Sequence, residues 1–261
     1  MKFISVTFFV ECLKIYKSKV FWLSMLFFVF VPFMMSLIML VQIHPEVSSR
    51  LGLVGTKASM LRFGEPGWEN YFSFLSQGIA AIGLVGYGFV TSWVFGREYS
   101  DKTIKDILAL PVSRAYIVLS KFMVIAVWCV LLTVIFYASS ILFGRIAGIP
   151  GWSYQVLSTF TLTFSKVSVL SILLCTPVAF LASYSKGYLL PFAFIILTLM
   201  LANFSGFVGL GPYFPWAVPG ILTVPPTEEI HLNTASYIIL FLTGIAGYLG
   251  TLGWWQYADH K

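Results

Sequence analysis

Residues 20–43 read VFWLSMLFFVFVPFMMSLIMLVQI, a run of 24 residues without Asp, Glu, Lys or Arg. A helix rises about 1.5 Å per residue, so about 20 apolar residues cross the hydrocarbon core of a bilayer, which is about 30 Å thick. The run therefore predicts a membrane-spanning helix, in which a kink at Pro32 is tolerated. It is longer than the apolar part of a cleavable signal peptide, about 7 to 15 residues, so we expect it to remain in the mature protein.

Five further stretches are long and apolar enough to cross a membrane as helices. They cover residues 71–95, 115–143, 163–182, 188–204 and 235–257. In lipid each backbone group has to find a partner within the protein, which favours helices for spans of this kind. We therefore predict an all-α membrane protein, a single domain over residues 1–261 with six transmembrane helices.

The composition of the whole chain agrees with a protein whose main solvent is lipid. Of its 261 residues, 59% are hydrophobic and only 10% are charged, whereas about a quarter of a soluble domain is charged. Most soluble enzyme folds are therefore excluded. Cys12, Cys129 and Cys175 lie far apart in apolar surroundings, which indicates small buried side chains and neither a metal site nor a disulfide framework.

The net charge of +6 is explained by how basic residues divide between the two sides of the membrane. Six spans place both termini on one side, together with eleven basic residues: Lys2, Lys14, Lys17, Lys19, Arg97, Lys102, Lys105, Arg114, Lys121, Lys186 and Lys261. The opposite side holds Arg50, Lys57, Arg62 and Arg145. Lys166 lies near the outer end of the expected fourth span. A charge at that place is explained equally well by snorkelling to the surface and by a functional role. Because basic residues favour the cytoplasmic side, we expect both termini there and no nucleic-acid partner.

Residues 2–19 precede the first span and carry a polar face. Four polar side chains, spaced by 4, 3 and 4 positions, share one side of a helix: Thr7, Glu11, Lys14 and Ser18. Apolar side chains, including Phe3 and Val10, face elsewhere. The pattern predicts an amphipathic helix in the cytoplasmic interface of the bilayer. The alternative is that this segment is only the snorkelling start of the first span.

The segment 205–234, between the last two spans, has an unusual composition for an external loop. It contains no Lys or Arg, five prolines and a largely apolar body. Irregular backbone at membrane depth is stable only when it packs against protein or lines a water-filled cavity. We expect a re-entrant plug or lid, with a plain interfacial loop as the alternative. The candidates for an external gate are Pro212, Phe214, Pro215, Trp216 and Pro219.

Patterns that indicate catalysis are absent from the sequence. It contains no GxxxxGK[ST] loop to hold phosphates and no HExxH pair, so we expect no catalytic, cofactor-binding or metal-binding residues in this chain. Glu228, Glu229 and His231 form one compact group of titratable side chains. Such a group could serve an intramembrane hydrolase, but its place in a Pro-flanked external loop favours a solvated hinge.

The second cytoplasmic loop, residues 95–114, reads FGREYSDKTIKDILALPVSR. Thr103 followed by Asp106 resembles a capping box, which predicts a helix from Ile104. This helix should end near Leu110, because Pro111 disfavours helical geometry in the residue before it. Two apolar turns projecting from a membrane domain are suited to inserting into a groove of a soluble partner; the alternative is a helix resting on the bilayer. Lys121, at the start of the next span, is expected to snorkel to the surface.

These residues resemble the cytoplasmic loop of ABC type-2 (ABC-2) exporter permeases. The resemblance rests on Glu98, on Thr103 opening a short helix, on the Pro-Val-Ser-Arg turn at 111–114 and on the Ser-Lys pair at 120–121. Asp101 and Lys102 stand where the family often has Gly before the Thr. The architecture of the whole chain is also similar to the stand-alone permeases of bacterial bacitracin- and lantibiotic-resistance exporters.

The resemblance implies a half-transporter in the bacterial plasma membrane. Two permease chains, identical or homologous, would face each other above two copies of a separate ATPase, which would hold ATP and Mg²⁺. Residues 96–114 would form the coupling loop and Ile104–Leu110 the coupling helix, with Glu98, Arg114 and Lys121 fixing its ends. The resulting candidates for ATPase coupling are Glu98, Thr103, Ile104, Ile107, Leu108, Leu110, Pro111, Arg114 and Lys121.

The expected function is export of an amphipathic substrate, such as a peptide antibiotic or another drug, by a chain that is not itself an enzyme. The composition of the spans favours this class, because they offer aromatic and aliphatic side chains and few charges to bind ions. A secondary transporter or channel that needs no ATPase is the alternative, and it would be expected to carry several ionisable groups inside its spans. An intramembrane hydrolase built on Glu228, Glu229 and His231 is the third hypothesis.

Overall fold

The computed structural model describes residues 2–44, 64–109, 111–224 and 232–258 of the chain. These residues form helices and turns with no β-strand among them. Six helices are long and apolar enough to cross a membrane: Lys19–Ile43, Trp68–Ser100, Arg114–Ile146, Tyr154–Tyr184, Leu189–Phe207 and Thr234–Tyr257. The predicted all-α membrane fold with six spans is therefore confirmed. Leu110 and the group Glu228, Glu229 and His231 lie outside the described residues.

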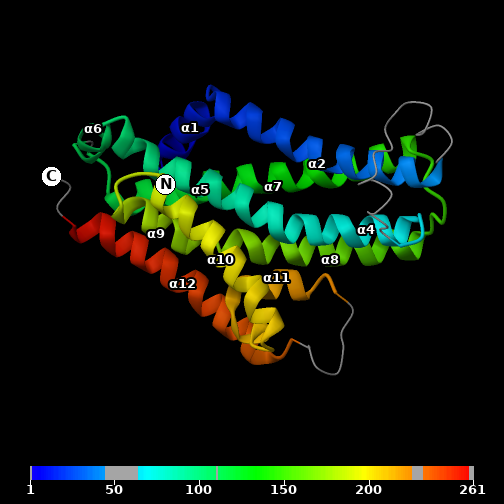
Figure 1. Ribbon diagram of the computed structural model, residues 1–261. Helices are drawn as coiled ribbons and strands as arrows, with labels where there is room; N and C mark the ends of the chain where they lie inside the picture. The colour runs from blue at the N-terminus through cyan, green and yellow to red at the C-terminus, as the bar shows by residue number, and fades with distance from the viewer. Residues whose placement is uncertain (1, 45–63, 110, 225–231, 259–261) are drawn as a thin grey trace.

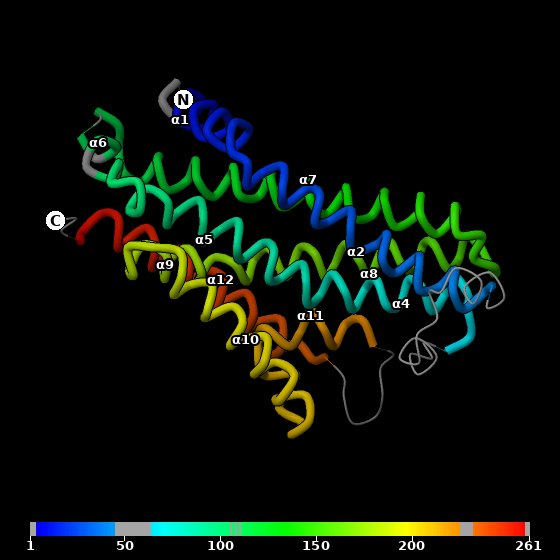
Figure 2. Tube along the Cα trace, turned by 45° about the horizontal axis from the view of Figure 1, so that its top comes forward, coloured from blue at the N-terminus to red at the C-terminus, as the bar shows by residue number. Residues whose placement is uncertain are grey.

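The spans pack as a long bundle with a second layer crossing it at an angle. The bundle contains α2 (Lys19–Ile43), α4 (Trp68–Gly78) continued through the π-helical turn η1 (Ile79–Gly83) into α5 (Leu84–Ser100), α7 (Arg114–Ile146) and α8 (Tyr154–Leu173), as Figure 1 shows. The second layer contains α10 (Leu189–Phe207) and α12 (Thr234–Tyr257). Helix α10 contacts α5 and α9 (Thr176–Tyr184), and α12 contacts α9 and α7. Figure 2 shows the same two layers from a second direction.

The core of the bundle is filled by aromatic side chains. Tyr71, Tyr87, Phe95, Trp128 and Trp255 are each at most 1% exposed. Burying one large side chain of this kind contributes about 1.5–3 kcal/mol. The surface of the bundle is apolar as well, with exposed side chains along α2 and α10, which is what a surface in contact with lipid requires.

The N-terminal segment forms a helix separate from the first span. Two residues separate helix α1 (Lys2–Tyr16) from α2. The second of them, Ser18, caps α2, because its hydroxyl accepts from the Val20 amide at 3.0 Å. Helix α1, the short helix α6 (Ile104–Leu108) and the C-terminal end of α12 all lie at the same end of the bundle (Figure 1). That α1 lies in the membrane interface stays a prediction.

The fourth span is interrupted and begins earlier than residue 163. Helix α8 starts at Tyr154, where the Ser153 hydroxyl accepts from the Val156 amide at 3.1 Å. The first turns of α8 are rich in Ser and Thr, so their sequence lacks the apolar character that identifies a span. The helix breaks before α9, whose second residue is Pro177, because proline removes a backbone hydrogen bond and clashes with the preceding turn.

Helix α12 crosses the bundle at this break through a glycine contact. The Thr176 hydroxyl donates to the Gly244 carbonyl at 2.5 Å. One turn further along α12, a Cβ atom on Gly247 would collide with the backbone of Thr176 and Pro177. The close approach of α9 and α12 therefore requires glycine at position 247, in the manner of small residues at helix contacts in membranes.

We expect Gly247→Ala to destabilise the protein by about 1–3 kcal/mol, because the added methyl group forces α12 away from α9. Gly253→Ala is the matched control, since a Cβ atom at Gly253 meets nothing within 4 Å. Thermal unfolding of the two purified variants in detergent measures the difference. Equal midpoints for the two variants would contradict the proposed contact.

Candidate functional site

A fully buried lysine lies at the end of the bundle that carries α6. Lys121, in the second turn of α7, has no exposed surface. Its ammonium Nζ lies 2.9 Å from Glu98 Oε1 and 3.3 Å from Glu11 Oε2, and it donates to the Val94 carbonyl at 3.3 Å. The prediction that Lys121 snorkels to the surface is wrong, because two carboxylates compensate its charge inside the protein, as burial of a charge requires.

The Glu98 carboxylate joins four segments of the chain. Its Oε1 atom accepts from Lys121 and from Lys14 Nζ at 3.3 Å, and lies 3.7 Å from Arg97 Nε. Its Oε2 atom accepts from the Thr103 hydroxyl at 2.8 Å. Helices α1, α5 and α7 and the residue before α6 therefore meet at one side chain, which is only 2% exposed.

Helix α1 contributes Glu11, which sequence reasoning did not place in the site. Glu11 is 5% exposed, and its Oε1 atom accepts from Lys14 Nζ at 2.9 Å. Burial raises the pKa of Glu11, but the positive charges of Lys121 and Lys14 outweigh burial, so the pKa lies below its ordinary value. Thr7, one turn earlier, shares a hydrogen bond of 2.6 Å with Ser120 of α7. The polar face predicted for residues 2–19 thus faces the protein, and its spacing was the signal for Glu11.

The start of α6 is built differently from the predicted capping box. Lys102 has a positive φ of 58°, which reverses the chain after α5. The amide of Thr103 then donates to the Glu98 carbonyl at 3.0 Å, and the Thr103 hydroxyl donates to the Glu98 carboxylate. The hydroxyl therefore bonds back to the end of α5, while Asp106 is exposed. Glu98 offers a charged acceptor, and hydrogen bonds to charged groups are the stronger ones.

The apolar side of α6 packs partly on the protein itself. Ile104 is 8% exposed and belongs to the main hydrophobic core, and Ile107 is half-buried against that core. Asp106, Ala109 and Pro111 are exposed. The side chain of Leu108, like residue Leu110, lies outside what the structure describes. Ile104 is therefore not available to a partner, contrary to the expectation that it belongs to a docking face, and the open surface of this segment includes Asp106 and Ala109.

Lys121, Glu98, Glu11 and Lys14 together form a charge cluster. Arg114 is not part of it. Its Nη1 atom donates to the carbonyls of Trp255 at 3.1 Å and Gln256 at 3.2 Å. These carbonyls belong to the last turn of α12, where backbone acceptors lack helical partners and favour a positive charge. Arg114 therefore ties the start of α7 to the end of α12.

The predicted external gate residues lie at the opposite end of the second layer, between α10 and α12. The segment forms two single turns, η2 (Gly211–Tyr213) and η3 (Pro215–Ala217), and the short helix α11 (Val218–Ile221). Pro212, Pro215 and Pro219 are buried, while Phe214 and Trp216 are half-buried. Trp216 packs against Phe194 of α10, with ring centroids 5.5 Å apart, and against Phe214 at 5.6 Å. Irregular backbone here is packed in protein; a gating role stays a prediction.

Comparison with known proteins gives two matches to this chain. A model of the ABC-2 family transporter proteins matches residues 7–203. The chain is also similar to the bacitracin transport permease protein BCRB of Bacillus licheniformis, with 28% identity over 181 residues, which cover 69% of this chain and 87% of that protein. No solved structure matches the chain. The matched region includes Glu11, Glu98 and Lys121 of the charge cluster.

We expect Lys121→Met to lower the free energy of unfolding by about 3–5 kcal/mol, because it leaves the carboxylates of Glu98 and Glu11 buried near a single remaining lysine, Lys14. Lys17→Met removes the same charge from an exposed position and should change stability by less than about 0.5 kcal/mol. Chemical unfolding in detergent, followed by tryptophan fluorescence, compares the two. A small effect of both substitutions would show that the buried pair is dispensable.

The lowered pKa of Glu11 predicts how acid affects the cluster. A carboxylate with a lowered pKa in the folded state stabilises the fold above its unfolded pKa, and this contribution is lost as pH falls through the folded pKa. Glu11→Gln should therefore be less stable than the original protein at neutral pH, and the gap should close in acid. Unfolding midpoints measured over an acidic pH series test this. A gap that is independent of pH would contradict the charged state assigned to Glu11.

Proposed function

The chain belongs to the ABC-2 family of transporter proteins, and we propose that it is the membrane subunit of an ATP-driven exporter whose ATPase is a separate chain. The family resemblance noted in the sequence is confirmed by the match over residues 7–203. Its six spans and its similarity to a transport permease make it a multi-pass membrane permease. The orientation that we propose places both termini, α1 and α6 in the cytoplasm, in agreement with the eleven basic residues on that side.

The sequence and the family support the proposal of a separate partner ATPase. The chain contains no GxxxxGK[ST] loop, and it therefore lacks the backbone cradle on which this class of ATPase binds phosphates. ATP and Mg²⁺ would be held by two copies of the ATPase. A second permease chain, identical or homologous, would complete the transporter.

The observation that carries this proposal is the attachment of α6 to the spans through Glu98. A push on α6 would reach the Glu98 carboxylate through Thr103, at 2.8 Å, and Lys121 of α7 through the next contact, at 2.9 Å. Helix α5 ends at this point and α7 begins close to it, so both spans would move with α6. A ligand or partner shifts a conformational equilibrium only through contacts that differ between the two states, and α6 is placed to make such contacts.

The substrate that we propose is amphipathic, and a peptide antibiotic is the leading candidate. The Bacillus licheniformis relative is a bacitracin transport permease, which supports this class of substrate. The exposed face of α10 is apolar and includes Leu197, Met200 and Phe204. A surface of this kind suits the apolar part of such a molecule. In this proposal the packed segment with Pro212, Phe214, Pro215, Trp216 and Pro219 acts as the external gate.

Substitutions on the open side of α6 should release the ATPase without unfolding the permease. We expect Asp106→Arg and Ala109→Arg each to abolish ATP hydrolysis in the tagged permease purified from its own cells, because both side chains are exposed. Gln256→Arg is the matched control, since it introduces the same side chain at an exposed position of α12 at the same end of the bundle.

The assay measures ATP hydrolysis and the presence of a chain with a phosphate-binding loop in each purified sample, together with the unfolding midpoint of the permease. Loss of the ATPase in both α6 variants, with unchanged midpoints and with the control intact, supports the proposal. An original protein that purifies without an ATPase, or α6 variants that retain it, would contradict the proposal.

A further inference from the structure

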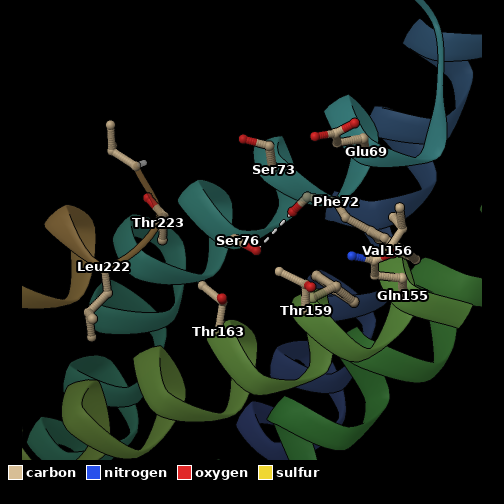
Figure 3. A pocket seen from close by; sticks show the side chains of 12 residues that line it. Glu69, Phe72, Ser73, Ser76, Gln155, Val156, Thr159, Thr163, Leu222 and Thr223 are labelled. Carbon is tan, nitrogen blue, oxygen red and sulfur yellow. Dashed lines mark hydrogen bonds between the residues drawn. The ribbon is translucent and has the colours of Figure 1, made fainter. Parts of the chain in front are cut away.

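A groove of about 600 Å³ opens between α4, α8 and the turn after α11 (Figure 3). Helix α4 and the start of α8, which line the groove, lie at the end of the bundle opposite α6 (Figure 1). This end is the outer side in the proposed orientation. Ligand sites of small molecules have volumes of about 300–1,000 Å³, so the groove is large enough to hold part of one. The residues of its lining that matter here are Glu69, Ser73, Gln155, Thr159, Thr163 and Thr223.

The polar residues of the groove follow the helical repeat on two neighbouring helices. Residues four positions apart lie on the same face of a helix, which aligns Glu69 with Ser73 on α4. The same spacing aligns Gln155, Thr159 and Thr163 on α8. Figure 3 shows the side chains of Ser73, Thr159, Thr163 and Thr223 around the same opening. These positions lie at the outer ends of the apolar runs 71–95 and 163–182, so the groove is placed where the membrane meets water.

The polar groups of the groove have hydrogen-bonding capacity that the protein does not use. Thr161 of α8 donates to the Leu157 carbonyl at 2.8 Å, as threonines in helices commonly do. Among the described residues, by contrast, no hydrogen bond satisfies the side chains of Gln155, Thr159 and Thr163. These groups are therefore free to bind water or a ligand.

The charge and the floor of the groove limit what it accepts. Glu69 is the only charged residue in the lining that the structure describes, and no described basic residue lies within ion-pair distance of it. Lys166 is exposed on α8, three residues beyond Thr163, but it does not line the groove. The stacked rings of Phe72 and Phe160, 4.0 Å apart, form an apolar part of the lining. A ligand with a cationic, hydrogen-bonding end and an apolar body matches all these features.

We propose that this groove binds the protonated amine of an amphipathic molecule, with the Glu69 carboxylate as the partner of the ammonium group and the hydroxyls of Thr159 and Thr163 as further acceptors. The inference rests on the proposed export function, because an exported amphipath leaves the transporter on this side. Two kinds of molecule carry the required ammonium group on an apolar body: a cationic substrate and the lipid phosphatidylethanolamine.

The test uses two fluorescent probes, of which only one carries a positive charge. The first is dodecane diamine with a dansyl group on one nitrogen and a free amine on the other, and the second is the same molecule with the free amine acetylated. Binding of each is measured by dansyl fluorescence to the full-length permease in nanodiscs of phosphatidylcholine and phosphatidylglycerol, without ATPase. The original protein should bind the free amine more tightly than its acetylated form.

The variants assign the preference to the groove. Glu69→Gln should weaken binding of the free amine by up to about fivefold, the upper range for a charge pair that remains partly exposed, and should leave the acetylated probe unchanged. Glu65→Gln removes an exposed carboxylate four residues earlier, outside the groove, and should change neither probe. Adding Thr159→Val and Thr163→Val to Glu69→Gln should weaken binding of the free amine more than Glu69→Gln does alone.

The outcomes separate the site from the transport function. Equal affinity of the original protein for both probes, or equal effects of Glu69→Gln and Glu65→Gln, would overturn the proposed site. Competition by phosphatidylethanolamine added to the nanodiscs would support the ammonium site and assign it to lipid, whereas a preference that survives this lipid would assign it to the substrate. Because the assay contains no ATPase, a permease that fails to bind an ATPase but keeps the amine preference would contradict the proposed function alone.

Discussion

A buried ammonium group, that of Lys121, holds together four segments at one end of this fold. Removing a lysine from water is tolerated only when carboxylates and further acceptors surround it, and Lys121 meets this condition with Glu98 and Glu11 from two other helices. The separate helix α1 is fixed in place because it supplies one of these carboxylates. The turn into α6 is fixed because Glu98 also accepts from Thr103. A charge pair inside a membrane protein thus positions elements that have no span of their own.

The same cluster determines how the short helix α6 is attached to the spans. Helix α6 covers only five residues, from Ile104 to Leu108, and a helix of that length is not stable alone in water. Its apolar residue Ile104 is buried in the permease, so α6 is held by the membrane domain before any partner binds. The surface that α6 leaves open includes Asp106 and Ala109. In the proposed function, a displacement of α6 would reach α5 and α7 through the contacts of Thr103, Glu98 and Lys121.

The sequence predicted the parts of this structure that depend on long-range composition, and failed where tertiary contacts decide. Long apolar runs, two of them with a single lysine near one end, identified the six spans, because lipid allows few alternatives to helices. The start of α8 at Tyr154 was missed, since its hydroxyl-rich turns face a polar groove and neighbouring helices rather than lipid. Glu98 and Lys121 were both among the candidates for ATPase coupling, but neither their pairing nor their burial was predicted, because a lysine at this position along a helix can equally well snorkel to the surface. The spacing of the residues showed the polar face that includes Glu11. Spacing alone does not show whether such a face contacts water or a buried lysine.

The unequal lengths of the helices have a consequence for the surrounding lipid. The continuous helix Trp68–Ser100 and α7 each contain 33 residues, about 50 Å at 1.5 Å per residue, whereas α10 contains 19 residues, about 28 Å. The bilayer therefore meets a tall apolar wall beside α7 and a short one beside α10. Lipids next to the short wall have to thin or tilt to cover it, at a modest cost per ångström of mismatch. A change in the thickness of the membrane would therefore affect the two layers of this permease to different degrees.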